Sequence, residues 1–140
     1  MADSTDAPPS ILSHVSLGTD DFPRAKAFYD AVLGTLGIRL LMEEANMAAY
    51  GRAFPEFWVQ TPHDGGKAGV ANGVHVAFLA TSRAQVAAFH AEAVAQGAKD
   101  DGPPGPRPHY GEPYYGCFVR DPQGHKVEAM FWDGPPPDPV

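Results

Sequence analysis

Apolar residues along the chain follow two periods, and segments of the two kinds alternate in a regular order. Two stretches place apolar side chains every three or four residues, which predicts amphipathic helices that begin near Asp21 and Ser82. Pro23 suits the first turn of the first helix, and Ser82 with Gln85 forms a capping-box pattern for the second. Other stretches alternate apolar and polar residues and predict strands. These strands lie at about 11–17, 38–44, 46–51, 55–60, 73–78, 98–101, 114–120 and 125–132.

The predicted elements also repeat along the chain. The segment 13–17 (Ser-His-Val-Ser-Leu) reappears as 74–78 (Val-His-Val-Ala-Phe), displaced by 61 positions, and the same displacement maps Phe28 onto Phe89. Such internal similarity is the sequence signature of a repeated module. We therefore expect an α+β fold of two βαβββ modules, at 11–60 and 73–132, that form a cupped mixed sheet around a cavity. A polar, glycine-rich linker would span 61–72, with flexible tails at 1–10 and 133–140.

Composition and charge narrow the class of protein. The net charge is -7 and the 10 Lys and Arg residues are scattered, so no basic surface for nucleic acid is visible. The chain has no run of 18 apolar residues, and its acidic N-terminus lacks an apolar signal segment, so we expect neither a membrane span nor secretion. The lone Cys117 is predicted to be a buried small side chain rather than a catalytic thiol, and it fits a cytoplasmic location.

Two histidines and one glutamate are predicted to share the sheet face that points away from the helices. Side chains alternate along a strand, so the apolar neighbours of His14, His75 and Glu128 pack against the helices and these three point the other way. In a cupped sheet that face lines a cavity, where two imidazoles and a carboxylate can bind one divalent ion: Zn, Ni, Mn, Co or Fe(II). Three ligands leave positions open for substrate, as a catalytic metal requires. The plainer alternative is that each histidine is an ordinary half-buried residue.

Longer motifs around these residues resemble one family over nearly the whole chain. They are 13–17 (Ser-His-Val-Ser-Leu), 27–34 (Ala-Phe-Tyr-Asp-Ala-Val-Leu-Gly), 73–78 (Gly-Val-His-Val-Ala-Phe) and 118–128 (Phe-Val-Arg-Asp-Pro-Gln-Gly-His-Lys-Val-Glu). The sequence resembles the vicinal-oxygen-chelate superfamily, which includes glyoxalase I, extradiol dioxygenases, fosfomycin-modifying thiol transferases and bleomycin-binding proteins. The resemblance implies one such domain at 11–132, one metal ion inside the cupped sheet and, often, a homodimer. It says little about the reaction.

The resemblance also implies roles for particular residues. His14, His75 and Glu128 match the family's metal ligands. Glyoxalase-like members carry a further ligand on the strand that closes the first module, where Glu56 and Trp58 share the cavity face. If Trp58 takes the ligand position, the site is a 2-His-1-carboxylate site, and Glu56 is left at its mouth as a candidate base. Glu128, displaced from the metal, and His109 are the other candidate catalytic groups.

A proline-rich loop at 102–113 is predicted to lie beside the cavity. The candidate substrate-binding residues in the loop, after it and on the cavity face are Trp58, Arg107, Tyr110, Tyr114 and Tyr115. A guanidinium, an indole and phenols would suit an anionic or aromatic small molecule. The plainer alternative is a stiff surface loop with solvated polar groups. His63, in the linker, and His125, beside a turn, are predicted to be solvated.

Several functions stay open on the sequence alone. The favoured one is a divalent-metal-dependent enzyme whose ion binds two neighbouring oxygens of a small substrate, with lyase or isomerase chemistry of the glyoxalase kind. An Fe(II) extradiol-type dioxygenase, with His109 moving a proton, is one alternative. Another is a protein that binds a small molecule such as an antibiotic without chemistry. The plainest is a scaffold in which the metal only stabilises the fold.

Overall fold

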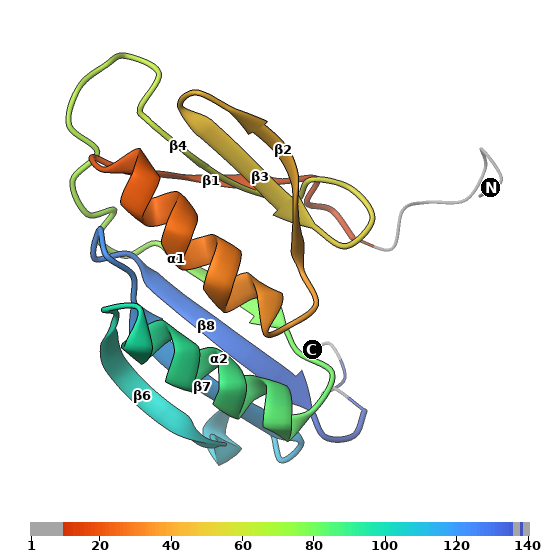
Figure 1. Ribbon diagram of the computed structural model, residues 1–140. Coiled ribbons are helices and arrows are strands. Elements are labelled where there is room, and N and C mark those ends of the chain that lie inside the picture. The colour runs from red at the N-terminus through yellow and green to blue at the C-terminus, as the bar shows by residue number, and fades with distance from the viewer. Residues whose placement is uncertain (1–9, 136–137, 139–140) are drawn as a thin grey trace, which may run out of the picture.

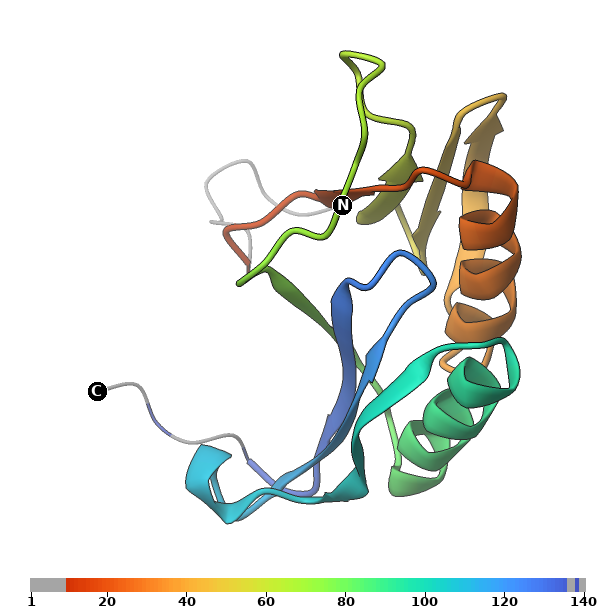
Figure 2. The same cartoon turned by 90° about the vertical axis from the view of Figure 1, so that its left-hand side faces the viewer.

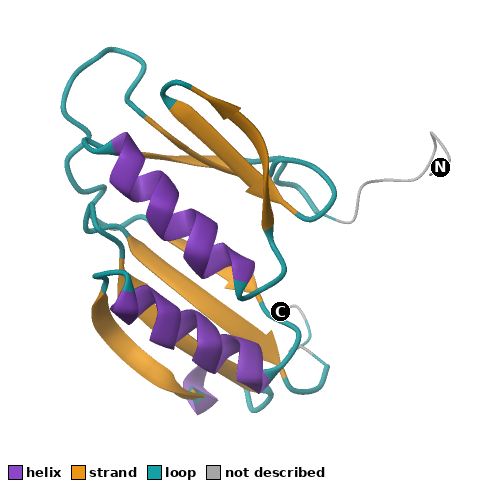
Figure 3. Ribbon diagram, in the orientation of Figure 1, coloured by secondary structure: helices purple, strands orange, loops and turns teal. Residues whose placement is uncertain are grey.

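The computed structural model describes residues 10–135 and residue 138. The first module contains β1 (Val15–Gly18), α1 (Phe22–Gly34), β2 (Arg39–Glu44), β3 (Met47–Gly51) and β4 (Phe57–Gln60) (Figure 1). The second contains β5 (His75–Leu79), α2 (Arg83–Ala95), β6 (Lys99–Pro106), the 3-10 helix η1 (Pro108–Tyr110), β7 (Tyr114–Arg120) and β8 (Lys126–Trp132) (Figure 3). Residues 1–9, 136–137 and 139–140 of the predicted tails lie outside the described residues.

Each module arranges its four strands in one mixed sheet of the same topology. The strand orders are β1-β4-β3-β2 and β5-β8-β7-β6, so the edge strands are β1 and β2 in the first sheet and β5 and β6 in the second. In each module the first strand pairs in parallel with the last, and the remaining pairs are antiparallel. The predicted α+β fold of two βαβββ modules is confirmed.

Both helices begin at a capping residue and lie on the same side of the molecule. The side chain of Asp21 accepts a hydrogen bond from the Arg24 amide (3.2 Å), and Ser82 accepts one from the Gln85 amide (3.1 Å). The two helices stack side by side, so the opposite faces of the two sheets point away from them (Figure 2). No helix in the described part of the chain is long and apolar enough to cross a membrane.

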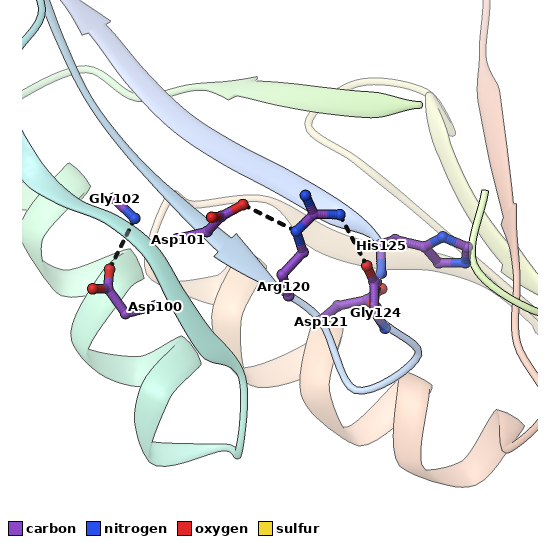
Figure 4. A network of polar contacts seen from close by, with 7 residues as sticks. All are labelled: Asp100, Asp101, Gly102, Arg120, Asp121, Gly124 and His125. Carbon is purple, nitrogen blue, oxygen red and sulfur yellow. Dashed lines mark hydrogen bonds and ion pairs between the residues drawn. The ribbon is translucent and has the colours of Figure 1, made fainter. Parts of the chain in front are cut away.

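The prediction of a loop at 102–113 is wrong for residues 102–106, which belong to a strand. β6 continues to Pro106, although it contains two consecutive prolines. It can do so because it is the edge strand of its sheet, where a residue without an N–H costs no ladder bond on the open side. The pairing is irregular around Gly102, whose amide donates to Asp100 Oδ1 (3.0 Å; Figure 4).

A buried polar cluster ties the β7–β8 turn of the second module to the first module. Tyr29 Oη, on α1, donates to Asp121 Oδ2 (2.5 Å), while Asp121 Oδ1 accepts three amides of the turn. His125 is also buried, and its Nε2 donates to the Gly18 carbonyl at the end of β1 (2.7 Å). The prediction of a solvated His125 is therefore wrong, because position beside a turn does not show that another module covers it. Nearby, Phe57 meets Phe78 edge to face, with 4.9 Å between ring centroids.

Candidate metal centre

The centre of the candidate site is a histidine–carboxylate pair on neighbouring strands. His75 opens β5, and Glu128 lies in the parallel strand β8, where it pairs with Ala77. His75 Nε2 lies 2.5 Å from Glu128 Oε1. The Glu128 side chain is 7% exposed and that of His75 41% exposed, so the carboxylate is held inside while the imidazole edge reaches solvent. A buried carboxylate must be paired, and here the imidazole supplies one partner.

The second oxygen of Glu128 is held by a buried phenol. Tyr114 Oη, from β7, donates to Glu128 Oε2 at 2.5 Å. Burial and the hydrogen bond to this carboxylate raise the pKa of Tyr114 well above its usual value, so the hydroxyl stays a donor. The ring lies across Gly116, where an added Cβ would overlap the phenol. Gly116 therefore makes room for the Tyr114 ring on its way across the sheet face to Glu128.

His14 approaches from the first module. It lies immediately before β1, is exposed, and its Nδ1 is 3.0 Å from Ser13 Oγ. Its ring centroid is 5.9 Å from that of Trp58 on β4. A cavity of about 370 Å³ between the two modules is lined by His14, Glu56 and His75 among others. The cavity thus brings together predicted residues of both modules, but Glu128 and Trp58 are not among the residues that line it.

The residue types present suit a divalent ion. His75 Nε2 and Glu128 Oε1 both offer lone pairs once the imidazole proton between them is lost, and imidazole with carboxylate is a common ligand set for such ions. Within the described residues, no three His, Cys, Asp or Glu side chains stand close enough together to hold an ion as they are placed. The structure therefore brings together two of the three predicted ligands, and the three-ligand site stays a prediction.

The strand register shows which residue of β4 corresponds to Glu128. In the first module Ser16 pairs with Trp58, and in the second Ala77 pairs with Glu128. Ser16 and Ala77 are related by the repeat, so Trp58 occupies the equivalent place. Glu56 lies before β4 and is exposed, with its backbone fixed by hydrogen bonds to Val15 and Tyr50. It lines the cavity together with His14 and His75.

The other predicted site residues divide between the two faces of the second sheet. His109 and Tyr110 stack on η1 (4.2 Å between centroids), and Tyr110 meets Tyr114 edge to face (5.1 Å). Arg107 extends over the ring of Phe118 at 5.8 Å. Tyr115 points to the opposite, helix-facing side, where the Arg83 guanidinium lies 4.7 Å from its ring centroid. Tyr115 therefore does not share a face with Glu128.

Sequence reasoning missed three residues that surround the histidine–carboxylate pair. Phe118 pairs with Glu128 across β7 and β8 and lies 5.9 Å from the His75 ring. Lys126 is the β8 partner of His75, and its Nζ lies 4.8 Å from the Phe118 ring centroid. Gly116 is the third. The alternation that places Glu128 on this face also places Lys126 there, so that signal was available from the sequence.

Comparisons with known proteins agree with this architecture. The family model described as "Glyoxalase/Bleomycin resistance protein/Dioxygenase superfamily" matches residues 11–129. The chain is similar to the solved structure of a glyoxalase/bleomycin resistance protein from Albidiferax ferrireducens T118, with 37% identity, a TM-score of 0.81, and coverage of 87% of this chain and 99% of that one. It shares its fold with lactoylglutathione lyase from Agrobacterium tumefaciens (22% identity, TM-score 0.63, 91% and 97% coverage). No curated protein matches.

Proposed function

Because the chain belongs to the glyoxalase/bleomycin resistance protein/dioxygenase superfamily, we propose that it is a divalent-metal-dependent enzyme that binds two vicinal oxygens of a small substrate. Lyase or isomerase chemistry is the form we favour. The observation that carries the proposal is the pair of His75 and Glu128, whose Nε2 and Oε1 atoms lie 2.5 Å apart on adjacent strands, with His75 lining the cavity between the modules. The buried Glu128 carboxylate is held against the His75 imidazole of the neighbouring strand, so two of the proposed ligands are already positioned for an ion.

In this proposal His75, Glu128 and His14 hold the ion, and Tyr114 fixes Glu128. The bound ion would polarise the chelated oxygens and stabilise negative charge that develops on them. Tyr114 occupies Glu128 Oε2, which leaves Oε1 as the ligand atom. The hydrogen bond from Tyr114 already restricts the Glu128 side chain, so little further conformational freedom of this side chain is lost when the ion binds.

Glu56 is the residue we assign as the general base. Its backbone is fixed by the amide of Val15, which donates to the Glu56 carbonyl, and by the Tyr50 carbonyl, to which the Glu56 amide donates (both 2.9 Å). Its carboxylate is exposed at the mouth of the cavity. There it can take a proton from the hydroxyl-bearing carbon of the substrate and return it to the neighbouring carbonyl carbon. The isomerisation is complete when the hydroxyl proton also passes to the former carbonyl oxygen, so that the hydroxyl and the carbonyl exchange places.

We further propose a homodimer in which His14 of one protomer completes the site of its partner. Within a chain, the helix–helix contact and the Tyr29–Asp121 hydrogen bond fix the two modules relative to each other. Exposed apolar side chains lie beside the cavity, at the segment before β1 and on or next to β5: Ile11, Leu12, Val74 and Leu79. An apolar surface of this kind is typical of an interface. We place the protein in the cytoplasm, where its lone cysteine needs no partner.

Mixed dimers test this arrangement directly. A preparation that combines His14→Ala and His75→Ala chains carries one intact site per mixed dimer if each site draws on both subunits. It then binds up to one metal ion per mixed dimer, although each variant alone binds none. A mixture with no restored binding shows that the site lies within one chain.

The proposed function is tested by elemental analysis of protein purified without added metal. We expect about one divalent ion per chain in the natural protein, none in His75→Ala, and an unchanged amount in the control His63→Ala, which changes an exposed linker histidine. Equal metal content in all three sinks the proposal. Turnover without oxygen supports the lyase or isomerase form, whereas oxygen consumption identifies the dioxygenase alternative.

A further inference from the structure

Lys126 stands beside the histidine–carboxylate pair on the same face of the second sheet. It is two residues before Glu128 on β8 and pairs across the sheet with His75, so the side chains of all three point to the same side. The side chain is half-buried, with its Nζ above the ring of Phe118 at 4.8 Å. The apolar ring supports the aliphatic stem and holds the ammonium at a defined place.

Arg107 brings a second cation to the same ring from the edge of the sheet. Its Nη2 donates to the Pro103 carbonyl (2.7 Å) and its Nη1 to the Pro106 carbonyl (3.1 Å), so the guanidinium is fixed above β6. An added Cβ at Gly102 would come close to both this guanidinium and the Phe118 ring, so a glycine is needed beneath them. Two cations therefore flank Phe118, on the face that carries His75 and Glu128.

The charges of Lys126 and Arg107 are not matched by neighbouring acids. The ion pairs within 4.0 Å in the described part of the chain involve other cations: Lys26, His75, Arg83, His90 and Arg120. Arg120, the next cation along the same face, is engaged by Asp101 and by the Gly124 carbonyl (Figure 4). Among the described residues neither Lys126 nor Arg107 has an acid within 4.0 Å, so both positive charges on the face of His75 and Glu128 are open to a negatively charged ligand.

We propose that the substrate is a small organic acid, whose anionic group binds Lys126 while its vicinal oxygens bind the metal. The inference rests on the proposed function and adds the chemical class of the substrate. Lys126 is the specificity-determining residue, because it stands next to His75 and no acid lies within 4.0 Å of its ammonium among the described residues. Arg107 adds positive potential from the far side of Phe118. A neutral substrate of the same shape would leave the Lys126 ammonium unpaired.

The test compares two chelating probes that differ only in charge. These are 3,4-dihydroxybenzoate and its methyl ester, both of which offer vicinal oxygens to a metal. Their affinities for the zinc-loaded protein are measured by titration calorimetry, with the zinc content checked after each titration. The acid and the ester also differ in how strongly they chelate zinc, but this difference is the same in every variant. The ratio of the two affinities is therefore compared between each variant and the natural protein.

We expect Lys126→Met to lower the preference for the acid roughly tenfold, since one charged hydrogen bond is lost while the apolar stem is kept. Lys126→Arg keeps the preference, and the control Lys67→Met, in the linker, leaves it unchanged. An equal ratio in the natural protein and Lys126→Met overturns the inference and leaves the proposed function standing. Failure of both probes to bind the zinc-loaded protein removes the proposed function and this inference together.

Discussion

The two modules share a strand order and a register but present different side chains at equivalent places. Trp58 in the first module stands where the second has Glu128, and Glu56 is related in the same way to Lys126. At the first of these positions the first module has an indole where the second has a carboxylate. At the other position the first module has a carboxylate where the second has an ammonium. The neighbouring strand differs as well, because Ala49 pairs with Trp58 where Phe118 pairs with Glu128. One scaffold therefore serves two purposes in the two halves.

This difference teaches that the two proposed ligands already held next to each other both lie in the second module. There the Glu128 carboxylate is held at both oxygens, by His75 and by Tyr114. The first module contributes His14 and an exposed Glu56, neither of which is held by the buried groups of its own sheet. We infer that the second half supplies two preorganised ligands of the ion, and that the first half supplies His14 as the third ligand and Glu56 as the base.

The largest expected effect comes from replacing Glu128. Glu128→Gln removes the charge and one lone-pair donor from the metal site, so we expect metal affinity to fall more than about 100-fold. Glu56→Gln, the matched change in the first module, should leave metal affinity within about twofold and lower turnover instead. Competition with a chromophoric chelator measures both affinities. Equal losses of metal in the two variants contradict the division of roles between the modules.

A smaller loss is expected when the support of Glu128 is removed. Tyr114→Phe leaves Oε2 without its donor in a buried place, and we expect metal affinity to fall about 10- to 100-fold. Gly116→Ala should act in the same direction, because its methyl group displaces the Tyr114 ring. The cobalt-substituted protein reports the change directly, since its visible spectrum follows ligand geometry. Tyr110→Phe, at an exposed phenol, is the control, and an unchanged spectrum in Tyr114→Phe counts against the supporting role.

The next change sharpens the comparison by making the modules more alike. Trp58→Glu places a carboxylate at the position that corresponds to Glu128. In the natural protein the Trp58 and His14 ring centroids are 5.9 Å apart, so this position is close to His14. We expect metal affinity to rise several-fold and the visible absorption of the cobalt form to weaken, as coordination number increases. Trp58→Phe should do neither. A fall in affinity with Trp58→Glu shows that the first module lies too far from the ion for this position to reach it.

Much of the fold follows from local patterns, and what was missed lies where the chain meets distant parts of itself. The helix starts at Asp21 and Ser82 could be predicted, because a capping side chain acts within three residues. The burial of His125 could not, because its partner is the carbonyl of Gly18 in the other module. The extension of β6 through its prolines depends on its place at the sheet edge, which only the topology shows.

The candidate site divides in the same way. Strand alternation predicted that His75 and Glu128 share a face, and it also covers Lys126. It could not predict that Tyr114 bonds to Glu128, since that contact needs the pairing of β7 with β8 and the gap above Gly116. Nor could it predict the distance from His14 to His75 and Glu128, because that distance depends on how the modules are arranged rather than on neighbouring residues.

The smallest expected effect is at Cys117, where the two modules again carry different residues in one place. The register relates Cys117 to Ala48, because these residues pair with Ala129 and Val59 respectively. Burial raises the pKa of the Cys117 thiol to about 11, so at pH 8 only about one thiol in a thousand is ionised. We therefore expect iodoacetamide to leave the folded protein unmodified at pH 8 and to modify it rapidly in urea. Cys117→Ala, which copies the first module, should cost about 1 kcal/mol of unfolding free energy and leave metal content unchanged. Rapid labelling of the folded protein, or loss of metal in this variant, would instead show that the Cys117 thiol has a role that Ala48 cannot have.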